Sequence, residues 1–360
     1  MAIGESLSLI DELKDTGTTL NSSWPSNLVL KVSSSIAVSL RRDGVGNGQA
    51  RLDTFSIEYN GDNITLINSL ILGDATVGGA EALYGTRSFD IAEISSGIFL
   101  ITRIGSSTSA KTIYFDIVSI GISGTISLLG TNSYDSTFNN SYAGLSLIIL
   151  NSSYFACVKA NSDNNPEIMT FSISGGTVTN VDSWAISGAT PYAGYTPRLV
   201  HIVGTTYLLL GSNLSATVII SASGVITKSF IATGSTSGRE VSAVKITDNI
   251  VAIARPTKID TLNVASDGSS ITLLDTEDYS GSPIASQIVY LSGTVYAISI
   301  GYTTSSSSIM TKYIDSSGNI GDTIVSLSSG FVEGLQPDIT KINNILVLVN
   351  KQVTTNYPSI

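Results

Sequence analysis

The stretch from Asp90 to Thr102 reads DIAEI-SSG-IFLIT, and it contains the unit from which the fold can be inferred. An alternating segment ends on an aliphatic residue, Ile94, a small polar turn follows, and a second, more apolar segment begins. Two short segments rich in β-branched residues around a three-residue polar turn are typical of a β-hairpin. The stretch therefore predicts two adjacent antiparallel strands.

The same unit recurs six more times. The other copies are LVLKV-SSS-IAVSL from Leu28, SLIIL-NSS-YFACV from Ser146, RLVHI-VGT-TYLLL from Arg198, SAVKI-TDN-IVAIA from Ser242, QIVYL-SGT-VYAIS from Gln287 and DITKI-NN-ILVLV from Asp338. The aliphatic residue that ends each first segment serves as an anchor, and the anchors are Val32, Ile94, Leu150, Ile202, Ile246, Leu291 and Ile342. Consecutive anchors are 44 to 62 residues apart, which suits a four-stranded blade of a β-propeller.

The sequence thus predicts one all-β domain over 1–360, a seven-bladed β-propeller with four-stranded blades. The seventh unit ends 18 residues beyond its anchor and is too short for four strands. Residues 1–17 contain a strand-like segment without a blade of its own, so the N-terminal strand is expected to complete the C-terminal blade and close the ring. The expected blades span approximately 27–74, 89–136, 145–188, 197–235, 242–281, 286–330, and 337–360 together with 1–17. A β-solenoid or two β-sandwiches would be the alternative, but solenoids usually repeat at shorter periods and sandwiches need no unit split across the termini.

Charge and hydropathy exclude several classes of protein. The net charge of -10 and the pI near 4.5 argue against nucleic acid as a partner, because phosphate binding needs a basic surface. No apolar run approaches the roughly 20 residues of a membrane-spanning helix, so no membrane insertion is expected. The N-terminus lacks the pattern of a secretory signal peptide. The single cysteine, Cys157, excludes an internal disulfide and is expected to be a small buried hydrophobe.

Residues for catalysis or metal binding are few. His201 is the single histidine, and neither a G-x-S-x-G elbow, an HExxH motif nor paired cysteines occur. We therefore predict no enzymatic activity, no catalytic residues, no metal site and no cofactor. A carbohydrase is the enzyme class that stays open, because it needs only two carboxylates and the chain has 28 acidic residues.

Alignment on the anchors indicates two polar rings along a central channel. Four residues before the anchors stand Leu28, Asp90, Ser146, Arg198, Ser242, Gln287 and Asp338, of which six are polar. One residue before the anchors stand Lys31, Glu93, Ile149, His201, Lys245, Tyr290 and Lys341. At one channel mouth Asp90, Arg198, Gln287 and Asp338 are predicted to bind a small polar ligand or a loop of a partner. The alternative is a water-filled channel that needs no ligand.

Three long segments lead into predicted innermost strands and should share one face of the disc. They run from Asp74 to Ser88, from Asn132 to Gly144 and from Ser187 to Pro197. The tyrosines that concentrate there are Tyr84, Tyr134, Tyr142, Tyr192 and Tyr195. Because tyrosine supplies contact area and a hydroxyl at low entropic cost, this face is predicted to be a recognition surface. Packing of these rings onto the blades is the alternative.

The Ser/Thr/Gly/Asn-rich, charge-poor and cysteine-poor sequence resembles propeller-type structural proteins of phages and archaeal viruses. The GH and WD pairs of WD40 repeats, the double glycine of kelch repeats and the Asp-box of sialidase-type propellers are absent, so no specific family matches. The resemblance implies a structural or attachment protein of a virion or an extracellular surface appendage. Its partners would be other structural proteins of the assembly and a cell-surface glycan or protein. A glycan-binding propeller and a carbohydrase are the alternatives.

Overall fold

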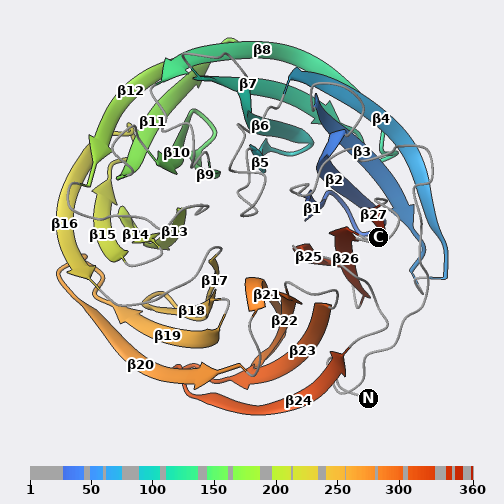
Figure 1. Cartoon of the computed structure of the whole chain (residues 1–360). Helices are drawn as coiled ribbons and strands as arrows, with labels where there is room; N and C mark the ends of the chain where they lie inside the picture. The colour runs from blue at the N-terminus through green and yellow to red at the C-terminus, as the bar shows by residue number, and fades with distance from the viewer. Residues whose placement is uncertain are drawn as a thin grey trace.

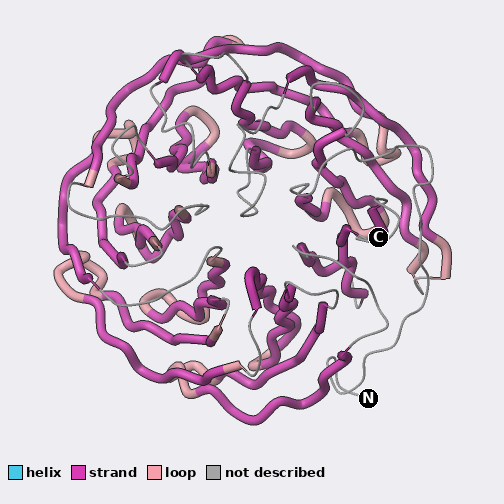
Figure 2. The backbone as a smooth tube through the Cα atoms, in the orientation of Figure 1, coloured by secondary structure: helices cyan, strands magenta, loops and turns pink. Residues whose placement is uncertain are grey.

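The computed structural model describes residues 27–43, 49–59, 62–74, 89–105, 111–136, 144–160, 165–186, 197–211, 214–233, 241–255, 257–279, 283–302, 307–328, 338–342, 345–351 and 358–359. All regular secondary structure in these ranges is β-strand, as Figure 2 shows. The strands form sheets that are arranged around a central axis (Figure 1). The prediction of an all-β propeller is confirmed.

Six consecutive segments each form an antiparallel sheet of four strands, in which strands adjacent in sequence pair. Blade 1 contains β1 (Asn27–Lys31), β2 (Ile36–Asp43), β3 (Gln49–Ile57) and β4 (Ile64–Asp74), and blade 2 contains β5 (Phe89–Ser95), β6 (Ile98–Gly105), β7 (Lys111–Ile120) and β8 (Ile126–Ser136). Blade 3 contains β9 (Leu145–Asn151), β10 (Tyr154–Ala160), β11 (Pro166–Ser174) and β12 (Thr177–Ala185), and blade 4 contains β13 (Arg198–Val203), β14 (Thr206–Leu210), β15 (Leu214–Ile220) and β16 (Ile226–Thr233). Blade 5 contains β17 (Ser242–Lys245), β18 (Ile250–Arg255), β19 (Lys258–Val264) and β20 (Ile271–Asp278), and blade 6 contains β21 (Pro283–Ser292), β22 (Val295–Tyr302), β23 (Ser307–Ile314) and β24 (Ile320–Ser328).

A further sheet follows blade 6 and has three strands in the described residues. It contains β25 (Asp338–Ile342), β26 (Ile345–Lys351) and β27 (Pro358–Ser359), and we call it the C-terminal sheet. The structure therefore shows six four-stranded blades, one fewer than the sequence predicts, and the count of seven is not confirmed. The difference lies in the C-terminal sheet, for which the described residues supply three strands. The predicted closing strand in residues 1–17 lies outside the described residues.

Apolar residues fill the spaces between adjacent sheets. The seven predicted hairpins form, and each of their anchors packs in a different core cluster between one sheet and the next. Ile342 of the C-terminal sheet, for example, packs with Val29 and Ile57 of blade 1. The anchors therefore pack between sheets, as predicted from their aliphatic character.

Aromatic residues strengthen the layer between blades 2 and 3. The ring centroid of Phe115 lies 5.3 Å from that of Phe155 and 4.8 Å from that of Phe171. Cys157 packs in the same cluster and is fully buried, as predicted. Because burial of a Phe side chain contributes about 3 kcal/mol, this layer makes blades 2 and 3 a firmly joined pair.

Threonine hydroxyls join the outer parts of neighbouring blades. In blades 1, 3, 4 and 5 a threonine of the third strand donates to the carbonyl of a glycine in an outer turn of the following blade, and the pairs are Thr54 with Gly124, Thr170 with Gly224, Thr217 with Gly268 and Thr261 with Gly318. Each threonine stands where a β-bulge shifts the register between the third and fourth strands. Gly318 has a φ of +90°, and a Cβ there would lie 2.7 Å from Leu274 Cδ1, so the tight approach requires glycine.

The alternation of strand direction gives the disc two different faces. The turns between the first and second strands and between the third and fourth strands lie at one end of every blade, which we call the turn face. The connections between the second and third strands and between successive blades start and end at the opposite end, which we call the loop face. Most described turns belong to the turn face, including those of the four threonine–glycine pairs.

Candidate functional site

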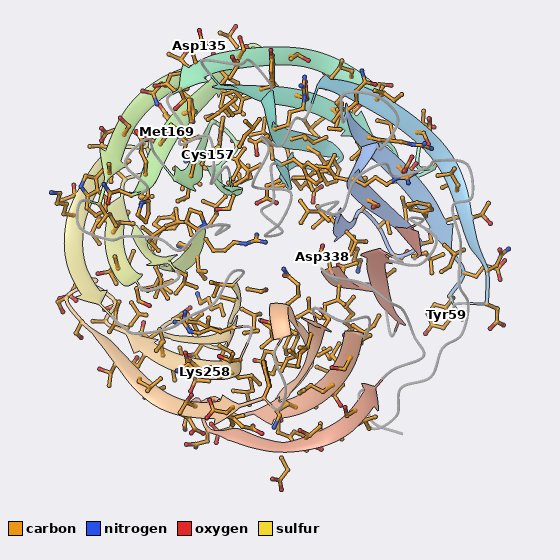
Figure 3. The ribbon with its side chains drawn as sticks, viewed as in Figure 1. Tyr59, Asp135, Cys157, Met169, Lys258 and Asp338 are labelled. Carbon is orange, nitrogen blue, oxygen red and sulfur yellow. The ribbon has the colours of Figure 1, made fainter. Side chains whose placement is uncertain are left out.

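The seven innermost strands carry two rings of side chains around the axis, one near each face. The loop-face ring consists of the residues four before each anchor, which are Leu28, Asp90, Ser146, Arg198, Ser242, Gln287 and Asp338. The turn-face ring consists of the residues one before each anchor, which are Lys31, Glu93, Ile149, His201, Lys245, Tyr290 and Lys341. Figure 3 shows Asp338 beside the central axis, while Asp135 lies at the rim.

The side chains of the loop-face ring, apart from Arg198, point toward the following sheet. All except Arg198 are buried, with Asp338 5% exposed. Leu28 illustrates the direction, because it packs with Phe89 and Ile91 of the following blade. This corrects the prediction that the polar ring lines an open channel. A strand presents its edge to the axis and its two faces to the neighbouring sheets, so alternate side chains are directed between sheets.

Three members of the loop-face ring make the same hydrogen bond to the next sheet. Asp338 Oδ2 accepts from the backbone N of Val29 at 2.6 Å, and Asp90 Oδ2 accepts from the backbone N of Leu147 at 2.8 Å. Ser242 Oγ accepts from the backbone N of Ile288 at 3.2 Å. An innermost strand has no strand partner on its axial edge, so its N–H groups there need another acceptor. The side chains of the loop-face ring provide this acceptor.

Two of the four remaining members of the ring have side chains that cannot accept such a hydrogen bond. Leu28 cannot accept a hydrogen bond, and the backbone N of Ile91 donates instead to Asp90 Oδ1 at 2.9 Å. Arg198 cannot accept either, and its Nη1 reaches from blade 4 to Asp90 Oδ2 of blade 2 at 3.7 Å. The Arg198 Nε is buried without a hydrogen-bond partner in the described residues. Arg198 therefore keeps donor capacity at the loop-face end of the axis.

The four predicted ligand-binding residues are thus brought to one ring, but their polar groups have structural partners. The carboxylates of Asp90 and Asp338 are occupied by backbone donors, and Gln287 is buried with a partner of its own. A ligand at this ring would have to compete with these contacts. Ligand binding by Asp90, Arg198, Gln287 and Asp338 stays a prediction.

The turn-face ring is far more accessible. Five of its members are exposed, which are Lys31, Glu93, His201, Lys245 and Tyr290, and Ile149 and Lys341 are half-buried. Its polar contacts are local and lie on the same or the neighbouring hairpin. Lys245 Nζ lies 2.8 Å from Asp248 Oδ1, and His201 Nε2 lies 3.0 Å from the carbonyl of Gly204. The hydrogen bond from Lys245 keeps the pKa of the Asp248 carboxyl below its usual value.

Buried ion pairs inside three blades were not predicted from the sequence. Near the loop face of blades 1, 2 and 5 an arginine pairs with an aspartate, and the same aspartate accepts a hydrogen bond from a hydroxyl group. The three sets are Arg41–Asp53–Ser69 in blade 1, Arg103–Asp116–Thr131 in blade 2 and Arg255–Asp260–Thr276 in blade 5. The Nε–Oδ2 distances are 2.7, 2.6 and 2.6 Å. The sequence did contain a signal for these ion pairs, namely a basic residue near the end of one strand followed by an aspartate in the next strand. These carboxylates are neutralised by guanidinium groups.

The predicted recognition tyrosines fall mostly outside the described residues, which include only Tyr134 of the five. The predicted loop from Asn132 begins as strand, because β8 continues to Ser136. The half-buried ring of Tyr134 packs edge-on against Phe171 of blade 3 at 5.3 Å between centroids. For this tyrosine the structure shows the packing alternative. Tyr84, Tyr142, Tyr192 and Tyr195 stay predictions.

The described residues hold few groups suited to chemistry. No group of three or more His, Cys, Asp or Glu side chains in them is placed to hold a metal ion. No helix in these ranges could span a membrane. Burial raises the pKa of the Cys157 thiol well above its usual value, so it stays protonated and is a poor nucleophile at neutral pH.

Solved structures of other proteins resemble the chain in fold. No protein-family model and no curated protein matches the chain. Among solved structures, a protein from Lactobacillus plantarum superimposes with a TM-score of 0.58 at 15% identity, over 88% of this chain and 87% of that one. A candidate 6-phosphogluconolactonase from Bacteroides uniformis gives a TM-score of 0.59 at 11% identity, over 88% and 90%. A protein of unknown function from Desulfotomaculum acetoxidans gives 0.54 at 17% identity, over 78% and 77%. At these identities the likeness shows the propeller fold alone.

Proposed function

We propose that the chain is a non-enzymatic structural or attachment protein of a virion or an extracellular surface appendage. In this role a rigid propeller presents the connections of its loop face to a partner or to a host surface. The observation that carries the proposal is the difference between the two faces. The turn face consists largely of short turns, several of them fixed by threonine–glycine hydrogen bonds. Connecting segments between successive blades, among them 75–88, 137–143, 187–196 and 329–337, all join strands that end at the loop face.

A rigid scaffold with variable connections on one face suits recognition, since binding residues concentrate on such loops. Four predicted recognition tyrosines, Tyr84, Tyr142, Tyr192 and Tyr195, belong to these connecting segments. Arg198, with spare donor capacity, begins an innermost strand at the same end. These features support a binding surface at the loop face. The composition, rich in Ser, Thr, Gly and Asn, supports a place in an assembly.

The proposal includes a complete seventh blade. The C-terminal sheet packs against blade 6 through Leu291 and Ile339, and against blade 1 through Ile342 and Val29. It thus occupies one position between these two blades with three strands of its own. A strand from residues 1–17 would be the fourth. Deleting residues 1–17 should then lower the melting temperature by several degrees, whereas an unchanged melting temperature would contradict this closure.

The engagement of the described carboxylates supports a role other than catalysis. Asp53, Asp116 and Asp260 pair with arginines, and Asp90 and Asp338 accept backbone hydrogen bonds. A glycosidase needs one carboxylic acid and one carboxylate facing its substrate about 5 to 10 Å apart. A carbohydrase would therefore have to use acidic residues other than these. Activity on a polysaccharide that disappears when one carboxylate pair is replaced would favour that alternative.

The first test is electron microscopy of the native assembly, combined with a glycan array. A propeller seated in a larger particle with its loop face outward is the expected result. A free monomer without any particle would contradict the proposal. A strong array signal would favour the glycan-binding alternative, in which recognition occurs at one loop cluster rather than in every blade, because the connecting segments differ in length and content.

A variant pair then tests which face binds the identified partner. Replacement of Tyr192 and Tyr195 by Ala removes two aromatic groups from a loop-face connection and should weaken binding at least tenfold. The matched control is Tyr59→Ala, because Tyr59 is 77% exposed and lies in the outer turn of blade 1 at the turn face (Figure 3). The control should bind like the wild type. Equal weakening by both changes, or by neither, would contradict recognition at the loop face.

A further inference from the structure

The turn-face ring is strongly asymmetric in charge. Following the sheets from blade 4 to blade 1, its positions hold His201, Lys245, Tyr290, Lys341 and Lys31 in that order. The strands that carry them contact one another in the same order, β13 with β17, β17 with β21, β21 with β25, and β25 with β1. We call these five residues the basic arc. Three lysines, the single histidine and a tyrosine thus stand at the turn-face ends of five successive innermost strands out of seven.

The hairpin turns next to the basic arc contain few acidic residues. The seven inner turns at this face, SSS, SSG, NSS, VGT, TDN, SGT and NN, contain one acidic residue, Asp248. It pairs with Lys245, but its side chain is 79% exposed, and such surface pairs are weak. Glu93 comes next after Lys31 in the ring, on β5 of the neighbouring blade 2, where it accepts from the backbone N of Gly97. The inner hairpins from blade 4 to blade 1 therefore carry mainly basic side chains at the turn face, in a chain whose net charge is -10.

The cations of the basic arc keep capacity for a ligand. Lys31 is exposed and makes no ion pair within the described residues. Lys341 Nζ donates to the carbonyl of Leu291, a neutral acceptor, and the described residues hold no counterion for this ammonium group. The ammonium of Lys245 has two further donors besides its bond to Asp248. The three lysines therefore keep charge for an anion at the turn face.

Tyr290 adds an aromatic surface in the middle of the arc. Its side chain is 48% exposed and stands between the strands of Lys245 and Lys341. Its ring meets that of Tyr296 edge-on at 5.6 Å between centroids, and Tyr296 is buried at 2% exposure. This contact holds the ring in a defined orientation. Tyr290 therefore offers an accessible apolar surface with a hydroxyl, flanked by positive charge.

We propose that the basic arc binds the carboxylate of an acidic sugar, such as a uronic acid unit of an oligosaccharide. Lysines attract and hydrogen-bond the carboxylate, and the tyrosine ring covers the apolar side of the sugar. An acidic peptide would use the lysines but would have no need of Tyr290, so the aromatic group favours the sugar. The site lies at the turn face and is independent of the recognition proposed for the loop face.

Isothermal titration of the intact protein with trigalacturonate tests this directly. Binding at low salt is expected, with the neutral sugar galactotriose at least tenfold weaker. Because the site depends on exposed charges, raising the NaCl concentration from about 20 to 300 mM should weaken binding severalfold. Absence of binding by the wild type up to about 10 mM ligand would overturn the proposal. Equal binding of the neutral sugar would overturn it too.

Single variants locate the site. Lys31→Gln and Lys341→Gln should each weaken binding about two- to fivefold, and Tyr290→Leu about threefold or more. Glu93→Gln removes a negative charge from the same opening and should tighten binding. Lys228→Gln is the charge-matched control, because Lys228 lies on outer strand β16 with its Nζ 5.4 Å from the centroid of Trp184. It should bind like the wild type.

A competition experiment separates the sugar from an acidic peptide. Hexaglutamate should displace trigalacturonate only weakly if both the charges and Tyr290 contribute. Stronger binding of hexaglutamate, unaffected by Tyr290→Leu, would overturn the sugar assignment and identify a peptide site. Equal weakening by Lys228→Gln and Lys31→Gln would also overturn the proposal, because binding would then follow net charge alone. Unchanged melting temperatures of the variants would confirm that the effects concern binding.

Discussion

The two ends of the innermost strands use polar side chains in opposite ways. Near the loop face, Asp90, Ser242 and Asp338 are buried and accept backbone hydrogen bonds from the following sheet. Near the turn face, Lys31 and Tyr290 are exposed and no sheet-to-sheet hydrogen bond is formed by either in the described part of the chain. The two rings are three residues apart on the same strands. Position along a strand therefore separates the buried acceptors that join sheets from the exposed Lys31 and Tyr290, while Lys341 of the turn-face ring still donates to the carbonyl of Leu291 in blade 6.

The difference follows from the direction of alternate side chains. Residues four before the anchor share a strand face with the anchor, and both point toward the following sheet. Residues one before the anchor point toward the preceding sheet, and the chain turns directly after the anchor, so long side chains there can extend past the turn into solvent. The loop-face ring should thus govern stability, and the turn-face ring should govern ligand binding.

The largest effect is expected from Asp90→Ala. Asp90 accepts from the backbone N of Leu147 and from its neighbour Ile91, and it lies 3.7 Å from Arg198. Its removal leaves buried donors without an acceptor, which should lower the free energy of unfolding by about 2–4 kcal/mol. Chemical denaturation measures this. Asp90→Asn keeps an acceptor oxygen and should lose only about 1 kcal/mol. Equal losses for both variants would show that these hydrogen bonds contribute nothing.

A somewhat smaller loss is expected for Asp338→Ala. Its carboxylate binds the backbone N of Val29, 309 residues earlier in the chain, at 2.6 Å. The expected loss is about 1–3 kcal/mol, and the effect should concentrate where the C-terminal sheet meets blade 1. Hydrogen exchange of the Val29 amide should accelerate more than that of Leu147. Similar acceleration throughout the ring would contradict a local role for this contact.

Ser242→Ala should lower the free energy of unfolding by less than the two aspartate variants do, since a neutral hydroxyl at 3.2 Å is a weaker acceptor than a carboxylate. We expect a loss of about 0.5–1.5 kcal/mol in the free energy of unfolding. Exchange of the Ile288 amide reports on the bond directly, and Leu147 serves as the internal control. If the Ile288 amide stayed protected in this variant, the loop-face ring would not act through its hydroxyls.

Much of the fold could be predicted because its signals are local. The hairpin from Asp90 to Thr102 shows both alternation and a polar turn within a few residues, and its anchor Ile94 packs between blades as the pattern indicates. The direction of Asp90 was not predictable in this way. A strand pattern reveals which residues share a face, but not that the face of an innermost strand is turned to the next sheet.

Contacts between distant residues also escaped prediction. Thr54 meets Gly124 across 70 residues, and Thr217 meets Gly268 across 51, so no fixed spacing reveals the pairs. The ion pair of Arg103 and Asp116 joins two strands through a connection of variable length. A signal did exist in the small residue and glycine that precede several fourth strands, as in Ser317-Gly318. It is visible only after the blades have been aligned.

The smallest effect on stability is expected from Lys31→Ala, which completes the contrast between the two rings. Lys31 is exposed, makes no ion pair within the described residues, and lies three residues after Leu28 on the same strand. Substitutions at such surface positions usually change the free energy of unfolding by no more than about 0.5 kcal/mol. Denaturation should therefore match the wild type, while trigalacturonate binding falls. A stability loss as large as that of Ser242→Ala would mean that Lys31 joins sheets as Lys341 does, and the separation between a structural and a binding end would no longer hold.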